Sequence, residues 1–162
     1  MTHEDTLQDG RHDFDFFMGS WKVHHRRLCE RLKGCTEWEE FEGTTVARAL
    51  PGVLGNVDES DLYRGGSVMY GMTLRLFNPA AQQWSLYWAS SATNKLDLPM
   101  IGSFKDGIGA FYAQEPFEGR AIFSRYIWSK ITPISCQWEQ AFSPDGGKTW
   151  ETNWIMENTR QE

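Results

Sequence analysis

One predicted strand alternates aromatic and ionisable side chains in a pattern that could bind an anion or move a proton. Residues 20–28 are typical of a β-strand, in which successive side chains point to opposite faces. Trp21, His25 and Arg27 therefore share one face, and if Trp21 points into the protein, the other two do so as well. An arginine can bind a carboxylate or an enolate, and a histidine can donate a hydrogen bond or act as a base near neutral pH.

Two further arginines could reach the same interior. Arg125 shares a face with Phe123 and Ile127, which favours an inward direction, whereas the direction of Arg75 stays open. An isolated charge inside a protein is very costly, so an inward arginine needs a partner. The first alternative is that the partner is a ligand anion. The second is an internal network of arginine and glutamate that fixes the strand register. The third is that these arginines point outward.

Partners and walls for such a site occur on other predicted strands. Glu40 shares a face with Trp38, and Gln140 shares one with Trp138, so either polar side chain could accompany an inward arginine. Tryptophans offer flat apolar surface to a ligand, although most tryptophans simply fill a core. The predicted ligand-binding residues are His25, Arg27, Trp38, Glu40, Arg75, Trp88, Arg125, Trp138, Gln140 and Trp154, with His25 as the candidate catalytic residue.

Histidine spacing gives no sign of a metal site. His24 and His25 are adjacent on the predicted strand, so their side chains point to opposite faces and do not readily share one ion. The sequence holds no His-x-His or His-x-x-x-His pair. We therefore expect no metal and no cofactor.

Length and composition favour one globular domain. The chain has 162 residues, of which 40% are apolar and 23% charged, so one core can form without a metal or a disulfide. The net charge of −6 disfavours nucleic-acid binding, which needs a basic surface. The three cysteines form no Cys-x-x-Cys pair, which predicts free thiols in a cytoplasmic protein. The N-terminal segment is polar, so we expect no signal peptide. The apolar runs are too short to predict a membrane span.

Turn signals divide most of the chain into short strands. Only residues 13–19 carry a helical pattern, a single turn in which Phe14, Phe17 and Met18 would plug one end of a barrel. We predict an all-β fold over residues 13–160, a closed or nearly closed antiparallel up-and-down barrel of about 8–10 strands, after a flexible N-terminus over residues 1–12. The predicted strands are 20–28, 35–41, 43–50, 54–59, 67–77, 83–90, 99–104, 108–114, 120–128, 134–142 and 149–158.

A glycine-rich segment near the C-terminus predicts a tight hairpin. Residues 143–150 read Ser-Pro-Asp-Gly-Gly-Lys-Thr-Trp and match the Asp-box pattern S-x-D-x-G-x-T-W. In such a turn the Ser and Asp side chains bond the backbone, a Gly adopts positive φ and the Trp packs beneath. The motif recurs in sialidase β-propellers, which contain several copies of it. This chain has one copy, so we predict an isolated hairpin.

Several of these motifs together resemble a known family. Gly19-Ser20-Trp21 is similar to the G-x-W signature of lipocalins and fatty-acid-binding proteins, in which the Trp closes the barrel base. The resemblance implies a lipocalin-like barrel that binds something small in its lumen, and it carries no established catalytic residues. A bacterial calycin-like family of unknown function is similar to this chain over about residues 13–160, through segments 14–21, 27–28, 74–79, 138–143 and 150–154.

These observations favour one function and leave three alternatives open. We expect the lumen to bind a small, partly apolar and anionic organic molecule. The first alternative is a cofactor-independent isomerase, cyclase or lyase that uses a lumenal His, Arg and Glu set, with His25 as acid or base. A haem-binding barrel with His24 or His25 as axial ligand is the second. The third is an interaction module, such as a homodimer, that uses outer aromatic faces.

Overall fold

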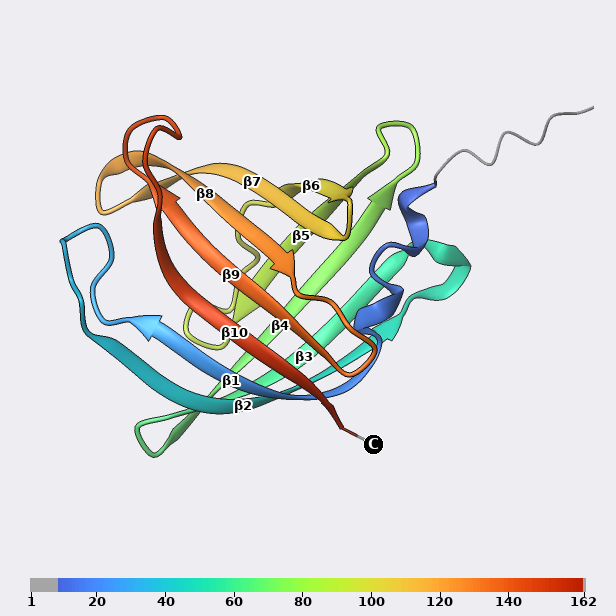
Figure 1. Ribbon diagram of the computed structural model, residues 1–162, viewed down its shortest axis with the longest axis horizontal. Helices are drawn as coiled ribbons and strands as arrows, with labels where there is room; N and C mark the ends of the chain where they lie inside the picture. The colour runs from blue at the N-terminus through green and yellow to red at the C-terminus, as the bar shows by residue number, and fades with distance from the viewer. Residues whose placement is uncertain (1–8, 162) are drawn as a thin grey trace, which may run out of the picture.

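Ten antiparallel strands close into one barrel in the computed structural model, which describes residues 9–161 (Figure 1). Each strand pairs with its neighbours in chain order, and the last strand returns to pair with the first. The predicted all-β closed barrel is therefore confirmed. The strands are β1 (Gly19–Leu28), β2 (Trp38–Ala49), β3 (Gly55–Arg64), β4 (Ser67–Asn78), β5 (Gln83–Ser90), β6 (Met100–Lys105), β7 (Ile108–Phe117), β8 (Arg120–Ser129), β9 (Ser135–Ser143) and β10 (Glu151–Gln161).

The second strand corrects one predicted boundary. We predicted separate strands over residues 35–41 and 43–50, whereas β2 is continuous through Gly43. Its buried positions alternate as Phe41, Gly43, Thr45 and Ala47, so the glycine keeps the two-residue period and does not break it. Gly43 pairs with Val23 on β1 and with a β3 residue on its other side, and these ladders hold the strand together.

The segment before β1 plugs one end of the barrel. Phe14 and Phe17 are almost completely buried, around the 3-10 turn η2 (Asp15–Phe17). The Phe17 ring stacks on Trp21 with centroids 5.2 Å apart, and the Trp21 indole donates a 2.8 Å hydrogen bond to the Phe17 carbonyl. Arg160 on β10 lies 4.3 Å above the Trp21 ring and donates to the Met18 carbonyl at 2.6 Å. The first and last strands thus hold the plug together.

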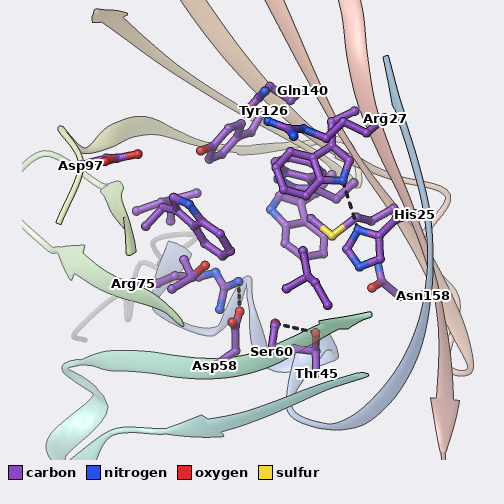
Figure 2. Close-up of a pocket in the computed structure, with 18 of the residues that line it drawn as sticks. His25, Arg27, Thr45, Asp58, Ser60, Arg75, Asp97, Tyr126, Gln140 and Asn158 are labelled. Carbon is purple, nitrogen blue, oxygen red and sulfur yellow. Dashed lines mark hydrogen bonds and ion pairs between the residues drawn. The ribbon is translucent and has the colours of Figure 1, made fainter. Parts of the chain in front are cut away.

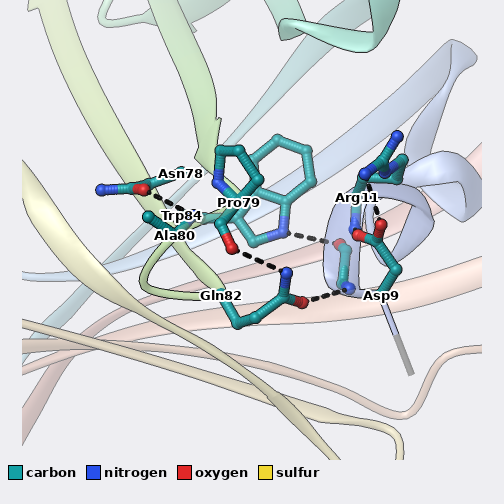
Figure 3. A network of polar contacts seen from close by, with 8 residues as sticks. Asp9, Arg11, Asn78, Pro79, Ala80, Gln82 and Trp84 are labelled. Atoms are coloured by element: carbon teal, nitrogen blue, oxygen red, sulfur yellow. Dashed lines mark hydrogen bonds and ion pairs between the residues drawn. The ribbon is translucent and has the colours of Figure 1, made fainter. Parts of the chain in front are cut away.

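Part of the predicted flexible terminus is folded against the barrel. The turn η1 (Gly10–His12) contacts the loop between β4 and β5 (Figure 3). Gln82 accepts from the Gly10 N–H at 3.1 Å, and the Trp84 indole donates to the Gly10 carbonyl at 3.0 Å. These bonds satisfy the turn's backbone groups, which is why residues 10–12 differ from the prediction. Residues 1–8 of the same prediction lie outside the described residues. Helical segments within residues 9–161, including η3 (Pro51–Val53), are all too short to cross a bilayer.

The glycine-rich segment forms the predicted hairpin between β9 and β10. Asp145 accepts from the Thr149 N–H at 2.9 Å and from its hydroxyl at 2.6 Å. The Ser143 hydroxyl donates to Asp145 at 2.9 Å and accepts from the Gly147 N–H at 2.8 Å. Gly147 has φ +92°, a conformation that L side chains rarely adopt. The Asp-box here is a structural turn that fixes the register of the last two strands.

Candidate ligand-binding site

The barrel encloses a cavity of about 360 Å³, a volume that suits a small organic molecule. Every strand except β6, two connecting segments and the turn η2 contribute side chains to it. The aromatic lining residues are Phe17, Trp88, Tyr126, Trp128, Trp138, Phe142 and Trp154. The acidic and basic lining residues are His25, Arg27, Arg31, Asp58, Arg75, Asp97 and Glu115. An apolar wall with a few polar groups is the usual composition of a ligand site.

Flat aromatic rings make one side of the cavity. Trp154 lies edge-on to Trp138 and to Trp88, with ring centroids 5.7 and 6.5 Å apart. Tyr126 packs against Trp138 with centroids 4.9 Å apart. A Cβ on Gly71 would lie 2.2 Å from the Trp88 ring, so this glycine on β4 makes room for the tryptophan. Edge-to-face packing locks the rings in place and leaves faces for a planar ligand.

His25 lies in the cavity wall and is 3% exposed. Its ring stacks on Phe41 at 4.5 Å, and its Nδ1 accepts a 3.1 Å hydrogen bond from the Trp154 indole (Figure 2). A Cβ on Gly43 would lie 3.0 Å from the other ring nitrogen, Nε2, so the β2 backbone lies close to that edge. The Trp154 bond leaves the proton of the neutral ring on Nε2.

Burial keeps the His25 ring neutral. Burial, together with the positive charges of His24 and Arg64, lowers the pKa of His25 to about 3. His25 is therefore a very weak base at neutral pH. The electrostatics favour a role as a neutral hydrogen-bonding group over the role of general base that the sequence suggested.

The pKa of His25 predicts a specific loss of stability in acid. The unfolded chain protonates this histidine below pH 6.5, whereas the folded chain resists protonation down to about pH 3. Folding therefore becomes less favourable as pH falls through this interval, by up to about 1.4 kcal/mol per pH unit. Urea denaturation of wild type and His25→Asn at pH 7, 6, 5 and 4 measures this. The asparagine oxygen can still accept the Trp154 bond, and we expect the variant to lose this part of the pH dependence. If the free energy of unfolding depends on pH in the same way for wild type and His25→Asn, the lowered pKa of His25 is contradicted.

Arg75 points inward and is already paired. It is 3% exposed, and its guanidinium forms an ion pair with Asp58, which is 4% exposed (Figure 2). The guanidinium also donates a 2.9 Å bond to Asn56. The same guanidinium lies over the rings of Phe14 and Phe17, at 5.1 and 5.3 Å. Neighbouring strands β3 and β4 supply the pair, so for Arg75 the structure favours the internal network over a free anion site.

Arg27 faces the cavity without an acidic partner. Its guanidinium lies 4.9 Å from the centroid of the Trp154 ring, and its buried Nε has no hydrogen-bond acceptor within residues 9–161. Among these residues it also forms no ion pair. Burial, with the nearby guanidinium groups of Arg31 and Arg64, lowers the pKa of Arg27 to about 10 against a smaller opposing effect of Glu39, so the group remains a cation at neutral pH. An unpaired cation on an aromatic wall is a favourable place for a ligand anion.

Arg31, in the connection between β1 and β2, adds a second positive charge. Its guanidinium lies over Phe117 at 5.3 Å and Phe142 at 5.7 Å. Burial lowers the pKa of Arg31 as well. No carboxylate of the described chain forms an ion pair with it. The charges of Glu118 and Glu115 act on Arg31 in the opposite direction, so the cavity has two neighbouring guanidinium groups with carboxylates near Arg31 but no ion pair to either arginine in the described chain.

An acidic group lies on another part of the lining. Asp97, in the segment between β5 and β6, and Glu115 on β7 both line the cavity. Burial, and then the charge of Asp97, raises the pKa of Glu115, whereas the charge of Arg31 acts to lower it. Tyr126 lies close enough for both carboxylates to act on it, and burial is the main cause of its raised pKa. Figure 2 shows Asp97 and Arg27 on opposite sides of the pocket, with Tyr126 between them.

Two predicted residues of β2 lie on the outside of the barrel. The buried positions of this strand are odd-numbered, so Trp38 and Glu40 point away from the lumen. Arg26 lies over the Trp38 ring at 5.1 Å, and Glu40 accepts a 3.0 Å bond from His24. Their placement in the cavity was wrong because the strand has aromatic residues on both faces, Trp38 on one and Phe41 on the other.

Arg125 also lies on the outer face. On β8 the inward positions are Ser124, Tyr126 and Trp128, and Arg125 instead stacks on Trp150 at 4.3 Å. The prediction failed because Phe123, which shares the face of Arg125, is 37% exposed and does not mark the core. Apolar side chains on both faces left the direction of this strand ambiguous.

The structure brings most of the predicted residues to one cavity. The predicted residues that line it are His25, Arg27, Arg75, Trp88, Trp138, Gln140 and Trp154. Gln140 donates a 2.8 Å hydrogen bond to Asn153. The sequence reasoning missed Arg31, Asp58, Asp97, Glu115 and Tyr126. Continuing the two-residue period from Phe111 or from Trp128 would have found Glu115 and Tyr126. Within residues 9–161 no three His, Cys, Asp or Glu side chains are grouped as metal ligands.

Comparisons with known proteins support the architecture. No protein-family model and no curated protein matches the sequence. Among solved structures, the chain is similar to an S-type phycobiliprotein lyase from Guillardia theta. The two are 11% identical over 98% of each chain, with a TM-score of 0.62. At this identity the similarity shows a shared fold alone, which agrees with a calycin-like barrel.

Proposed function

We propose that the barrel binds a small, partly apolar and anionic organic molecule in its lumen. The observation that carries the proposal is Arg27, a cavity-lining guanidinium with no acidic partner in the described chain. The contrast with Arg75 is informative, because that more deeply buried arginine has Asp58 and Asn56 as partners. A half-buried cation without an ion-pair partner carries a cost of desolvation, and a bound anion would offset that cost.

The rest of the cavity supports a ligand with a flat apolar body. Arg27 lies over Trp154, which packs edge-on to Trp138 and Trp88, so the cation and the aromatic wall form one continuous surface. A carboxylate or sulfonate attached to a planar ring system would place its charge on the guanidinium and its rings on this wall. The fold shared with the phycobiliprotein lyase supports a lumen of this kind only at the level of architecture.

The enzyme and haem alternatives receive less support from His25. A pKa of about 3 makes this histidine a poor base, and its Nδ1 already accepts the Trp154 hydrogen bond. The nearness of the Gly43 backbone to Nε2 leaves little room for an axial bond to iron. Binding without a reaction at His25 is therefore the function that we favour.

A pair of fluorescent probes tests the proposal. The first is 8-anilinonaphthalene-1-sulfonate, and the second is N-phenyl-1-naphthylamine, which has the same ring body without the sulfonate. We expect Arg27→Gln to weaken binding of the sulfonate by about tenfold or more, as for the loss of a charge-assisted bond, and to leave binding of the neutral probe unchanged. Fluorescence titration gives both dissociation constants.

Arg125→Gln is the matched control, because it removes an outward guanidinium that also stacks on a tryptophan. We expect it to bind both probes like wild type. Equal affinity of wild type and Arg27→Gln for the sulfonate would contradict an anion site at Arg27. An equal loss for both probes would also contradict it, because that pattern indicates a damaged cavity.

A further inference from the structure

Two cysteines lie together at the base of the segment that connects β1 and β2. Cys29 directly follows β1, and Cys35 precedes β2, with five residues between the two cysteines. The Cys29 N–H donates a 2.9 Å hydrogen bond to the Glu37 carbonyl, and the Cys35 thiol donates to the same oxygen at 3.6 Å. Because one carbonyl oxygen accepts from both residues, the Cys35 sulfur lies beside the backbone of Cys29.

Strand pairing indicates how closely the two residues approach. The Cys29–Glu37 bond continues the antiparallel β1–β2 ladder beyond its last pair. Cys35 comes two residues before Glu37, so it takes the place of the diagonal neighbour of Cys29 on the same face. Diagonal neighbours have Cα atoms about 7–8 Å apart, whereas a disulfide needs about 4.4–6.8 Å. A small closure of the connecting segment, outside the ladder, would therefore bring the two sulfurs into bonding range.

Solvent reaches these two cysteines, whereas the third cysteine is buried. Cys29 is exposed, Cys35 is half-buried and Cys136 on β9 is buried, and all three thiols are free. Desolvation, and then the charges of Cys35 and of Glu37 and neighbouring glutamates, raises the pKa of Cys29. Because the thiolate is the attacking species, we expect oxidation of the pair to be slower at pH 7 than at pH 8.5.

The segment between the two cysteines carries a residue of the cavity. Arg31 lines the cavity, and its guanidinium lies 5.7 Å from the centroid of the Phe142 ring. The next residue, Leu32, has φ +59° and donates its N–H to Glu151 on β10 at 2.7 Å. A covalent bond between the cysteines would close this segment into a ring and restrict the backbone that carries Arg31.

We infer that Cys29 and Cys35 are a redox-active pair, which exchanges with a small-molecule disulfide to form a reversible bond across the base of the Arg31 segment. One thiolate attacks the small disulfide, which gives a mixed disulfide and releases one small thiol. The second thiolate then attacks the protein sulfur of the mixed disulfide and releases the second small thiol. The protein loses two protons and two electrons, and the small disulfide gains both as it becomes two thiols. This modification site goes beyond the proposed lumenal function and does not depend on it.

Reaction with oxidised glutathione tests the pair. Reduced wild type is incubated with oxidised glutathione at pH 8.5, quenched with acid and analysed by intact mass spectrometry and peptide mapping. We expect wild type to lose about 2 Da, to contain a cross-link between Cys29 and Cys35, and to recover its mass with dithiothreitol. Cys29→Ser and Cys35→Ser each lack one thiol of the pair, so they should instead retain one glutathione as a mixed disulfide. Hydrogen exchange over residues 30–34 should slow in oxidised wild type.

Cys136→Ser is the matched control, because it removes the buried cysteine, and it should lose about 2 Da as wild type does. Wild type that keeps its mass, or that accumulates glutathione without the internal cross-link, would overturn the pair. A cross-link that involves Cys136 would overturn it as well. Equal hydrogen exchange over residues 30–34 before and after oxidation would contradict the restraint on the Arg31 segment.

Discussion

Asp58→Asn should lower the free energy of unfolding by about 3–5 kcal/mol, the cost of removing one partner of a buried ion pair. The asparagine nearly conserves the shape of the side chain but removes the charge that faces Arg75. Both partners are almost completely buried, at 4% and 3% exposure, so water cannot replace the lost carboxylate. Asn56 would remain as a neutral acceptor for the guanidinium. Urea denaturation followed by tryptophan fluorescence measures the loss.

Two further variants identify the cause of this loss. Glu40→Gln removes an exposed carboxylate that contacts His24 and Arg26 outside the barrel, and it should cost less than about 1 kcal/mol. Adding Arg75→Met to Asp58→Asn removes the orphaned charge and should recover most of the lost stability. A loss at Asp58 no larger than at Glu40 would contradict the buried pair, and so would a double variant less stable than Asp58→Asn alone.

Trp21→Ala should also lower the free energy of unfolding, by about 3–5 kcal/mol. Trp21 is fully buried, stacks on Phe17 and donates to its carbonyl, and Arg160 covers its other face. Its removal leaves a cavity between the plug and the first strand, which the rigid barrel cannot fill. Thermal and urea unfolding both measure the effect.

Trp38→Ala is the control for Trp21→Ala, because it removes the same side chain from the outer face of β2. We expect Trp38→Ala to lower the free energy of unfolding by far less than Trp21→Ala does. Trp21→Phe should fall between the two, since it keeps an aromatic ring against Phe17 and loses the indole hydrogen bond. Similar losses for Trp21→Ala and Trp38→Ala would contradict the role given to the plug.

The two-residue period made the fold and part of the cavity lining predictable. On β1 it placed His25 and Arg27 on the buried face of Trp21, and the structure has them there. The same rule failed on β8, because a strand with Phe123 on one face and Trp128 on the other does not reveal its inner side. The period identifies which residues share a face, and packing against other strands decides where that face points.

The remaining site residues depend on contacts that a single sequence does not contain. Asp58 meets Arg75 because β3 and β4 pair in one register, which follows from the turn and from both strands together. Arg31 and Asp97 lie in connecting segments, where no periodic pattern indicates direction. These segments reach the cavity only because the barrel closes and brings distant elements to one end.

Native mass spectrometry tests the central claim, that Arg27 holds an anionic ligand in the lumen, most directly. Wild type, Arg27→Gln and Arg125→Gln are incubated with the small-molecule fraction of a cell extract, desalted and measured before and after organic extraction. We predict a small-molecule adduct on wild type and on Arg125→Gln that organic extraction removes, and no such adduct on Arg27→Gln. An adduct of equal occupancy on all three proteins, or none on any of them, would contradict the claim.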